Sequence, residues 1–501
     1  MKLKTIIISG MALWLLSCSI QSPKKHEAKI YKSEWESLKK HVTPQWFQNA
    51  KFGIYCHFGA YCVPAFKNEW YSHWMYIDTV AWGNNYFQHH LKTYGPLDKF
   101  GYKDFIPMFK AEKFDADEWA DLFQKAGAQF AGPVTEHADG FAMWNSKLTK
   151  WNAAQMGPKR DIVGELSKAI RKRNMKFIAT FHHQWKYGWY PTWDKHTDAS
   201  NPDLEDLYGP EVPKGTFEMP EQKTNPLPDK KFNDEWLAKI QEVIDNYNPD
   251  LIYFDSKMSI IQESTRLDML SYYYNQAVTK KQDVVVTFKS HDLAEGSAVI
   301  DMERSRMAEK KPYPWLTDDS IDWNTWCDVS DPHYKSANRI IDFMIDVISK
   351  NGCVLLNITP KANGEIPQPV KERLLEIGAW LKINGEAVYG THPWKIYGEG
   401  LFKVVEGHLN EQVNADNTVE DIRFTQKGNS LFVFVLDWPT SDVMIRSLGK
   451  KAALLDKKVK RMELLGSNAE IKWEIADEAM KITFPKVKPC ENAYVLKLTL
   501  E

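Results

Sequence analysis

Short apolar runs alternate with longer amphipathic stretches over most of the chain. The apolar runs occupy residues 52–56, 129–134, 176–181, 251–254, 284–288, 298–300 and 353–358. Between them, apolar residues recur at helical spacing and predict helices over residues 116–126, 162–173, 234–246 and 337–349. Strands that alternate with helices are typical of parallel β/α units. The pattern therefore predicts an α/β fold.

Polar residues follow the predicted strands at their carboxyl ends. They are His57, Glu136, His137, His182, His183, Asp255, Lys289, His291, Asp301, Glu303 and Asn357. In a (β/α) barrel these ends converge on one face, where active sites are built. An open doubly wound sheet also binds ligands at these ends, but it normally carries a glycine-rich phosphate turn, which this sequence lacks. We therefore expect a TIM-like (β/α)8 barrel.

The pattern changes after Trp394. Residues 395–501 consist of short alternating segments separated by turn residues, without a long helical pattern. This predicts a C-terminal antiparallel β-sandwich that follows a barrel catalytic domain at 31–394. Residues 190–232 are rich in proline, aspartate and lysine, and we expect them to form a long loop or lid over the barrel mouth.

The N-terminal residues are typical of an export signal. Two early lysines precede a short apolar run at 6–16, which is too short to remain as a spanning helix. The run ends in Leu-Leu-Ser-Cys18, which resembles a bacterial lipoprotein box, although an ordinary signal peptide with an incidental cysteine is the alternative. We expect a signal peptide at 1–17, lipid attachment at Cys18, and a tether at 18–30. The protein would then be exported and lipid-anchored on the periplasmic or cell-surface face of a bacterial membrane.

The composition excludes some classes of function. The 501 residues include 64 Lys and Arg against 66 Asp and Glu, so no basic excess offers a footprint for nucleic acid. Aromatic residues make up 13% of the chain, which suits both a carbohydrate-handling protein and a large aromatic core. Cys56, Cys62, Cys327, Cys353 and Cys490 form no C-x-x-C pair, which argues against a zinc site of paired cysteines.

Carboxylates at two predicted strand ends offer the chemistry of glycoside cleavage. Asp255 follows the run at 251–254, and Asp301 and Glu303 follow the run at 298–300. One carboxyl group attacks the anomeric carbon or activates water, while the other protonates the departing oxygen. Taken singly, each residue also fits a structural role, as a helix cap or as the partner of a loop cation such as Arg304.

Histidines and aromatic residues gather at the same predicted rim. Imidazoles donate and accept hydrogen bonds, so they suit sugar hydroxyls, and the alternatives are a metal site or histidines satisfied within the fold. The spacing from Glu136 to Asp139 matches no recognised ligand pattern, so we expect no metal. Indole rings suit the apolar faces of a sugar, although a tryptophan in the core is as plausible. The candidates for sugar contact are His57, Glu69, Trp70, His137, His182, His183 and Trp185.

Several ordered motifs carry a resemblance to a known family. They are KFGIYCHFGAY at 51–61, EWY at 69–71, HADGFAMWNS at 137–146, GPKRDIV at 157–163 and LIYFDS at 251–256. They resemble motifs of glycoside hydrolase family 29, the α-L-fucosidases. The resemblance implies an exo-acting, retaining enzyme that removes terminal α-L-fucosyl residues from oligosaccharides or glycans without a cofactor.

The resemblance also implies roles for individual residues. Asp255 matches the nucleophile, and Glu303 lies where the acid/base segment of the family falls. Four residues match positions that contact fucose, namely His57, Glu69, Trp70 and His137. Three more lie where the family places further pocket residues, namely His182, His183 and Trp185.

The chain departs from the family motifs at three positions. Ala138 replaces a second histidine that normally contacts a fucose hydroxyl, Phe58 replaces a tryptophan, and Ser256 replaces a glycine. A branched, substituted or sulfated fucoside would fill the space left at Ala138. The alternatives are a sibling enzyme for a sugar such as α-L-galactose, a catalytically weakened fucose-binding lipoprotein, and a metallohydrolase. The sequence leaves the linkage and the oligomeric state open.

Overall fold

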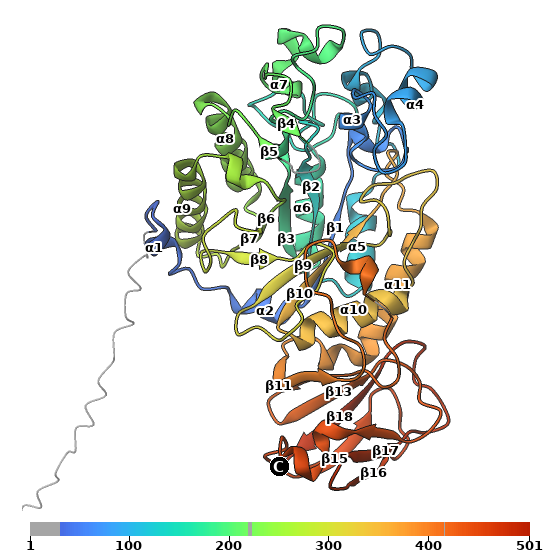
Figure 1. The fold of residues 1–501 in the computed structure, drawn as a ribbon. Helices are drawn as coiled ribbons and strands as arrows, with labels where there is room; N and C mark the ends of the chain where they lie inside the picture. The colour runs from blue at the N-terminus through green and yellow to red at the C-terminus, as the bar shows by residue number, and fades with distance from the viewer. Residues whose placement is uncertain (1–30, 219–222, 415) are drawn as a thin grey trace, which may run out of the picture.

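A closed barrel of eight parallel strands forms the upper part of the molecule (Figure 1). The computed structural model describes residues 31–218, 223–414 and 416–501. The strands run around the barrel in the order β1-β10-β9-β8-β7-β6-β3-β2. They are β1 (Phe52–Cys56), β2 (Phe130–Glu136), β3 (Lys176–Phe181), β6 (Leu251–Phe254), β7 (Val285–Lys289), β8 (Val299–Asp301), β9 (Trp315–Ser320) and β10 (Gly352–Ile358). The predicted (β/α)8 barrel is confirmed.

One of these strands, β9, was not among the predicted apolar runs. Its sequence WLTDDS has only two strongly apolar residues, both at its start, so it does not form an apolar run. All six residues are nevertheless buried, because the strand lies between β8 and β10. The polar half of β9 ends at the barrel face where the other strands carry their polar residues.

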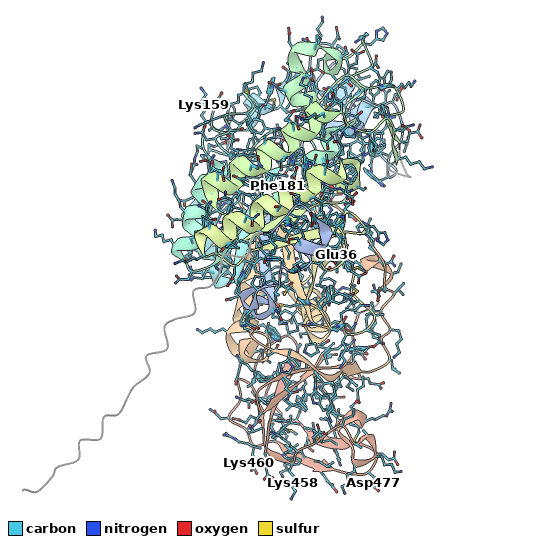
Figure 2. All side chains as sticks on the ribbon, turned by 90° about the vertical axis from the view of Figure 1, so that its left-hand side faces the viewer. Glu36, Lys159, Phe181, Lys458, Lys460 and Asp477 are labelled. Atoms are coloured by element: carbon cyan, nitrogen blue, oxygen red, sulfur yellow. The ribbon has the colours of Figure 1, made fainter. Side chains whose placement is uncertain are left out.

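Helices cover the outside of the barrel, and each of the four predicted helices is present within a few residues. Figure 2 shows α8 and α9 packed side by side across the near face. The long helices are α5 (Ala116–Lys125), α6 (Ile162–Lys172), α8 (Lys230–Tyr247), α9 (Glu263–Lys280), α10 (Ala337–Ser349) and α11 (Gln368–Asn384). The short ones are α1 (Trp35–Leu38), α2 (Gln45–Ala50), α3 (Tyr71–Trp74), α4 (Tyr86–Thr93) and α7 (Glu205–Tyr208). The N-termini of α5, α6, α8 and α10 are capped by Asp115, Asp161, Asp229 and Ser336, whose side chains each accept a hydrogen bond from a backbone N–H.

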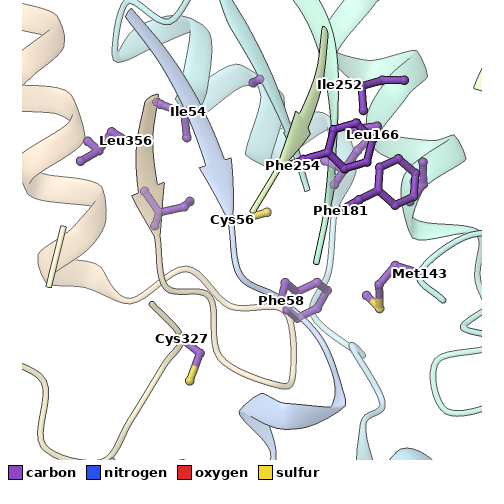
Figure 3. Close-up of a cluster of buried hydrophobic side chains, with 14 of the residues drawn as sticks. Ile54, Cys56, Phe58, Met143, Leu166, Phe181, Ile252, Phe254, Cys327 and Leu356 are labelled. Carbon is purple, nitrogen blue, oxygen red and sulfur yellow. The ribbon is translucent and has the colours of Figure 1, made fainter. Parts of the chain in front are cut away.

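Side chains of successive strand residues alternate between the barrel interior and the layer under the helices. The interior cluster includes Tyr55, Tyr253, Val285, Leu316 and Leu355. The outer cluster, part of which Figure 3 shows, includes Ile54, Cys56, Ile252, Phe254 and Leu356. This alternation buries both faces of every strand and rigidly orients the residues that follow the strand ends.

Two antiparallel sheets follow the barrel and pack over a second apolar core. The larger sheet has the order β11 (His392–Glu399), β12 (Ile422–Lys427), β13 (Ser430–Val435), β18 (Tyr494–Leu500) and β15 (Val459–Leu464). The smaller one has the order β14 (Val443–Ile445), β17 (Met480–Thr483) and β16 (Lys472–Ile475). The predicted β-sandwich is confirmed, while the domain boundary at 394/395 stays a prediction.

Residues 190–232, predicted as a long loop or lid, hold several short elements. The segment contains α7, β4 (Phe217–Glu218) and β5 (Lys223–Thr224). Across residues 31–218, 223–414 and 416–501, every helix is too short or too polar to cross a bilayer. The predicted signal peptide, Cys18 and tether lie outside the described residues.

Candidate active site

A cavity of about 670 Å³ opens at the carboxyl ends of the barrel strands. It receives His57 after β1, His137 after β2, His182 after β3, Asp255 after β6 and Glu303 after β8. Glu69, Trp70 and Trp185 also line it. The fold therefore brings eight of the nine residues predicted for catalysis and sugar contact to one place.

The ninth residue, His183, does not line the cavity, which removes the geometric basis for its predicted sugar contact. Its Nε2 lies 3.2 Å from the carbonyl oxygen of Trp236, and its ring stacks on the Trp236 indole. Adjacent residues at a strand end point to opposite sides, so His182 faces the cavity while His183 faces α8.

Two further predictions for the cavity wall also lack support from the geometry. Ala138 is buried in the apolar core and does not line the cavity, so its small side chain leaves no extra room for a substituent. The described residues of 190–232 do not line the cavity either. Phe217 of that segment packs behind Trp70 and Trp185 instead, so the segment supports the aromatic wall rather than covering the mouth.

Lys289 at the end of β7 lies at the centre of four carboxyl groups and is almost fully buried. Its Nζ donates to Asp255 at 3.0 Å and to Glu303 at 2.6 Å. Asp301 and Asp318 lie 3.7 and 3.6 Å from the same nitrogen. One cation thus holds both proposed catalytic carboxyl groups, and two further acidic groups lie beneath them.

The surroundings shift the pKa values of the two proposed catalytic groups in opposite directions. Burial raises the pKa of Asp255, but the nearby Lys289 and His182 reverse this effect and hold the pKa below its ordinary value. Burial also raises the pKa of Glu303, and the negative charges of Asp318 and Asp255 leave it above the usual range despite Lys289. The surroundings therefore favour the ionised form of Asp255 and shift Glu303 toward its protonated form.

The two deeper carboxyl groups differ in the same way. Burial and the neighbouring Asp318 raise the pKa of Asp301 well above its usual range. Burial raises the pKa of Asp318 as well, but Lys289 and the Tyr55 hydroxyl, which donates to it at 2.7 Å, bring it below the ordinary value. The shifts therefore favour the protonated form of Asp301 and the ionised form of Asp318.

The imidazole of His57 is held in one tautomer. Asn357 donates from its amide nitrogen to the carbonyl oxygen of Trp326 at 2.7 Å, so its Oδ1 faces His57. That oxygen accepts from the backbone N–H of His57 and lies 2.8 Å from Nδ1, which must therefore carry hydrogen. Nε2 of His57 is left to accept a hydrogen bond. Burial lowers the pKa of His57 to about 3, which keeps the ring neutral.

His57, His137 and His182 form a compact cluster in which one ring nitrogen of each lies within 4.8 Å of the others. Burial lowers the pKa of all three rings, so neutral imidazoles face the cavity. Neutral imidazoles can bind sugar hydroxyls, and they are also the form that ligates Zn²⁺. The donor set therefore fits either ligand, although the Asn357 contact occupies Nδ1 of His57.

Glu69 and two tryptophans form another wall. The Glu69 carboxylate accepts from the backbone N–H of Trp326 at 3.0 Å and from the Thr325 hydroxyl at 3.4 Å. Burial raises the pKa of Glu69 to about 7, although the backbone N–H of Trp326 opposes the shift. Trp70 meets Trp185 edge to face, with ring centroids 5.3 Å apart. The wall combines a hydroxyl acceptor with apolar ring faces, which suits a sugar.

Arg304 does not weaken the proposed acid. Its guanidinium donates to the carbonyl oxygens of Asp322, Trp323 and Thr325 and lies 4.5 Å over the Trp326 ring. These contacts direct its charge toward the loop after β9, so Lys289 remains the cation that contacts Glu303.

Three important residues of the site were not assigned a role from the sequence. Lys289 is recognisable only as a polar residue at a strand end. Asp318 lies on β9, the strand without an apolar run. His408 lies 105 positions beyond Glu303, in the segment after β11, yet its Nε2 is 3.3 Å from Glu303 Oε2. No motif near His408 indicates this contact.

Comparisons with known proteins agree with this geometry. The family model for alpha-L-fucosidase matches residues 18–386, and the model for the alpha-L-fucosidase C-terminal domain matches residues 414–499. The tissue alpha-L-fucosidase of Rattus norvegicus is 30% identical, with 94% of this chain and 92% of that protein covered. The tissue alpha-L-fucosidase of Homo sapiens is 29% identical, with 94% and 92% covered.

A solved structure extends the likeness to three dimensions. The Thermotoga maritima alpha-fucosidase in complex with fucose is 28% identical, with a TM-score of 0.72. The match covers 94% of this chain and all of that chain. Both family models, the whole-length relatives and the barrel with its C-terminal sheets lead to one assignment. The chain belongs to the alpha-L-fucosidase family and is a glycoside hydrolase.

Proposed function

We propose that the protein is an exo-acting α-L-fucosidase that acts on terminal α-L-fucosyl residues with retention of anomeric configuration. The observation that carries the proposal is the contact of Asp255 and Glu303 with one lysine nitrogen. Oxygens at 3.0 and 2.6 Å from a shared nitrogen lie no more than about 5.6 Å apart. Retaining glycosidases hold their carboxyl groups ~5–5.5 Å apart, whereas inverting enzymes need room for a water molecule.

The proposed reaction has two displacements. In the first, the ionised Asp255 attacks the anomeric carbon, the glycosidic bond breaks, and Glu303 protonates the departing oxygen. In the second, Glu303 removes a proton from water, and the water oxygen displaces Asp255 from the sugar. The lowered pKa of Asp255 and the raised pKa of Glu303 support these roles.

Recognition of fucose is proposed for the surrounding walls. His57, His137 and His182 offer neutral imidazoles to the hydroxyl groups, and Glu69 offers a hydroxyl acceptor. Trp70 and Trp185 offer ring faces to the apolar side of the sugar. The related Thermotoga maritima enzyme, which was solved with fucose bound, supports the same sugar class for this chain.

Wild-type protein is expected to hydrolyse an aryl α-L-fucoside and to release α-L-fucose as the first product, because double displacement restores the configuration. NMR during the first minutes of the reaction, before mutarotation, checks the product. An aryl α-L-galactoside is expected to react at least about 10-fold more slowly, because a site selective for fucose would have to accommodate an extra hydroxyl group in place of a hydrogen of the C6 methyl group.

The same assay separates the alternatives. Initial release of β-L-fucose would contradict retention, and equal or faster reaction of the galactoside would favour the sibling enzyme. Binding of fucose without hydrolysis would favour a binding protein. As a control for the histidine cluster, prior treatment with a chelator is expected to leave the rate unchanged. A loss that Zn²⁺ restores would favour the metallohydrolase.

We also propose that Cys18 is lipid-modified and anchors the exported protein to a bacterial membrane. The apolar run at 6–16 and the Leu-Leu-Ser-Cys18 sequence support this proposal. In a bacterial host, the full-length protein is expected in the membrane fraction with incorporated radiolabelled palmitate. Cys18→Ala is expected to lose the label, and incorporation of the label into that variant would contradict the proposal.

A further inference from the structure

Residues 400–414, here called the return segment, leave β11 and come back to the barrel mouth. The backbone N–H of Leu409 donates to the carbonyl oxygen of Glu303 at 3.0 Å. Glu406 accepts from the backbone N–H of Ala308 at 2.7 Å, which attaches the segment at a second point. The return segment is therefore bound directly to the loop that carries the proposed acid.

Buried charges hold the other end of the return segment. Glu411 is 3% exposed, forms an ion pair with Lys335 and lies 3.8 Å from Arg304. Arg339 of α10 donates to the carbonyl oxygen of Asn414 at 3.0 Å. Nearly all of the segment lies between the two stretches that the family models match, which end at residue 386 and begin at residue 414. The two family models therefore do not describe the contact of this segment with the site.

The return segment brings His408 against one oxygen of Glu303. Nε2 of His408 lies 3.3 Å from Oε2, the same oxygen that accepts from Lys289 at 2.6 Å. The other oxygen, Oε1, has no hydrogen-bond partner within residues 31–218, 223–414 and 416–501. Because Glu303 lines the cavity, Oε1 is the oxygen that remains available to a ligand.

A carboxylic acid carries its proton on one oxygen, and the surroundings decide which one. The Lys289 ammonium donates to Oε2, and Nε2 of His408 lies 3.3 Å from the same oxygen. Donation from both groups would favour lone pairs on Oε2, so that the transferable proton is favoured on Oε1. The titratable groups that interact with Glu303 are Lys289 from β7, Asp255 after β6, Asp301 from β8, Asp318 from β9, Glu69 and His408. Of these, His408 and Lys289 contact Oε2 directly.

We propose that His408 is a positioning residue for the acid step, because it reserves Oε2 and leaves the proton on Oε1 toward the leaving oxygen. The inference rests on the proposed role of Glu303. As the glycosidic bond breaks, its electron pair goes to the leaving oxygen, which takes the proton from Oε1, while Asp255 forms the new bond to the anomeric carbon. Glu303 becomes a carboxylate that Lys289 and His408 both stabilise.

The test compares leaving groups that need protonation with one that does not. For His408→Ala, kcat/KM for a fucosylated disaccharide is expected to fall roughly 10-fold, a part of the 10²–10⁴-fold that general acids contribute. The value for 2,4-dinitrophenyl α-L-fucoside is expected to change less than about two-fold, because this leaving group departs as a stable anion. His408→Gln is expected to recover most of the loss, because its amide N–H can donate to Oε2.

His392→Ala is the matched control, because this histidine of β11 is exposed and, within the described part of the chain, its ring makes one hydrogen bond, with the carbonyl oxygen of its neighbour Pro393. Equal losses on both substrates, or no loss on the disaccharide, would overturn the role proposed for His408 and leave the proposed function in place. Failure of His408→Gln to recover activity would overturn the donor argument. Wild-type protein that hydrolyses neither fucoside would overturn the proposed function, and the inference with it.

Discussion

Asp255→Asn is expected to lower kcat for an aryl α-L-fucoside by about 10⁴-fold or more, which corresponds to about 5.5 kcal/mol of activation free energy. The amide has nearly the shape of the carboxylate but cannot form the glycosyl ester, so the first displacement is lost. Steady-state kinetics with the aryl fucoside measures the effect. Asp331→Asn is the control, because the Asp331 side chain is 79% exposed and lies outside the cavity.

The identity of the nucleophile is checked by mass spectrometry. A 2-fluoro-fucosyl fluoride slows hydrolysis of the intermediate and is expected to leave one labelled peptide, which contains Asp255. A label on Glu303 or on another residue would place the nucleophile elsewhere. Unchanged kcat in Asp255→Asn would contradict the double-displacement proposal outright.

Lys289→Met is expected to lower the free energy of unfolding by about 3–5 kcal/mol, because it leaves buried carboxylates without their counter-charge. Lys289 lowers the pKa of Asp255, so its loss raises that pKa toward the value that burial alone would set. The stability from ionised Asp255 is present above the unfolded-state pKa and is lost as the pH falls through the folded-state pKa. Because Asp255 acts as the nucleophile in its ionised form, the acidic limb of kcat/KM should also move to higher pH in the variant.

Urea unfolding and the pH profile of kcat/KM measure these two effects. Lys257→Met is the matched control, because Lys257 is also buried but lies against the rings of Phe217 and Trp185 rather than carboxylates. Burial lowers the pKa of Lys257 to about 7, so its replacement is expected to leave stability unchanged or to raise it. Equal stability of Lys289→Met and wild type would mean that the four carboxyl groups do not depend on one lysine.

Local sequence patterns were sufficient to predict a strand or helix where apolar residues repeat along it. The apolar run at 251–254 became β6, and the helical spacing at 337–349 became α10. The strand β9 escaped detection because its second half is polar and is buried only by its neighbours in the closed barrel. Burial of polar residues depends on the whole barrel, so a local apolar pattern does not report it.

The residues of the site also differ in how far the sequence could identify them. The strand-end position of Asp255 and Glu303 and the resemblance to the family identified the proposed catalytic pair. The choice between His182 and His183 needed side-chain direction, since both follow the same strand and only His182 faces the cavity. Ala138 suggested additional space, but its surroundings close over it.

The sequence by itself determined the α/β barrel, the β-sandwich and the family, because each depends on periodicity or on motifs of neighbouring residues. Only the tertiary structure decided how Lys289 joins four carboxyl groups and how the return segment brings His408 to Glu303. These contacts join residues that lie far apart in the chain, and their geometry arises only when the strands close into a barrel. The charge states that the proposed chemistry needs follow from that closure, because burial and close charges set them.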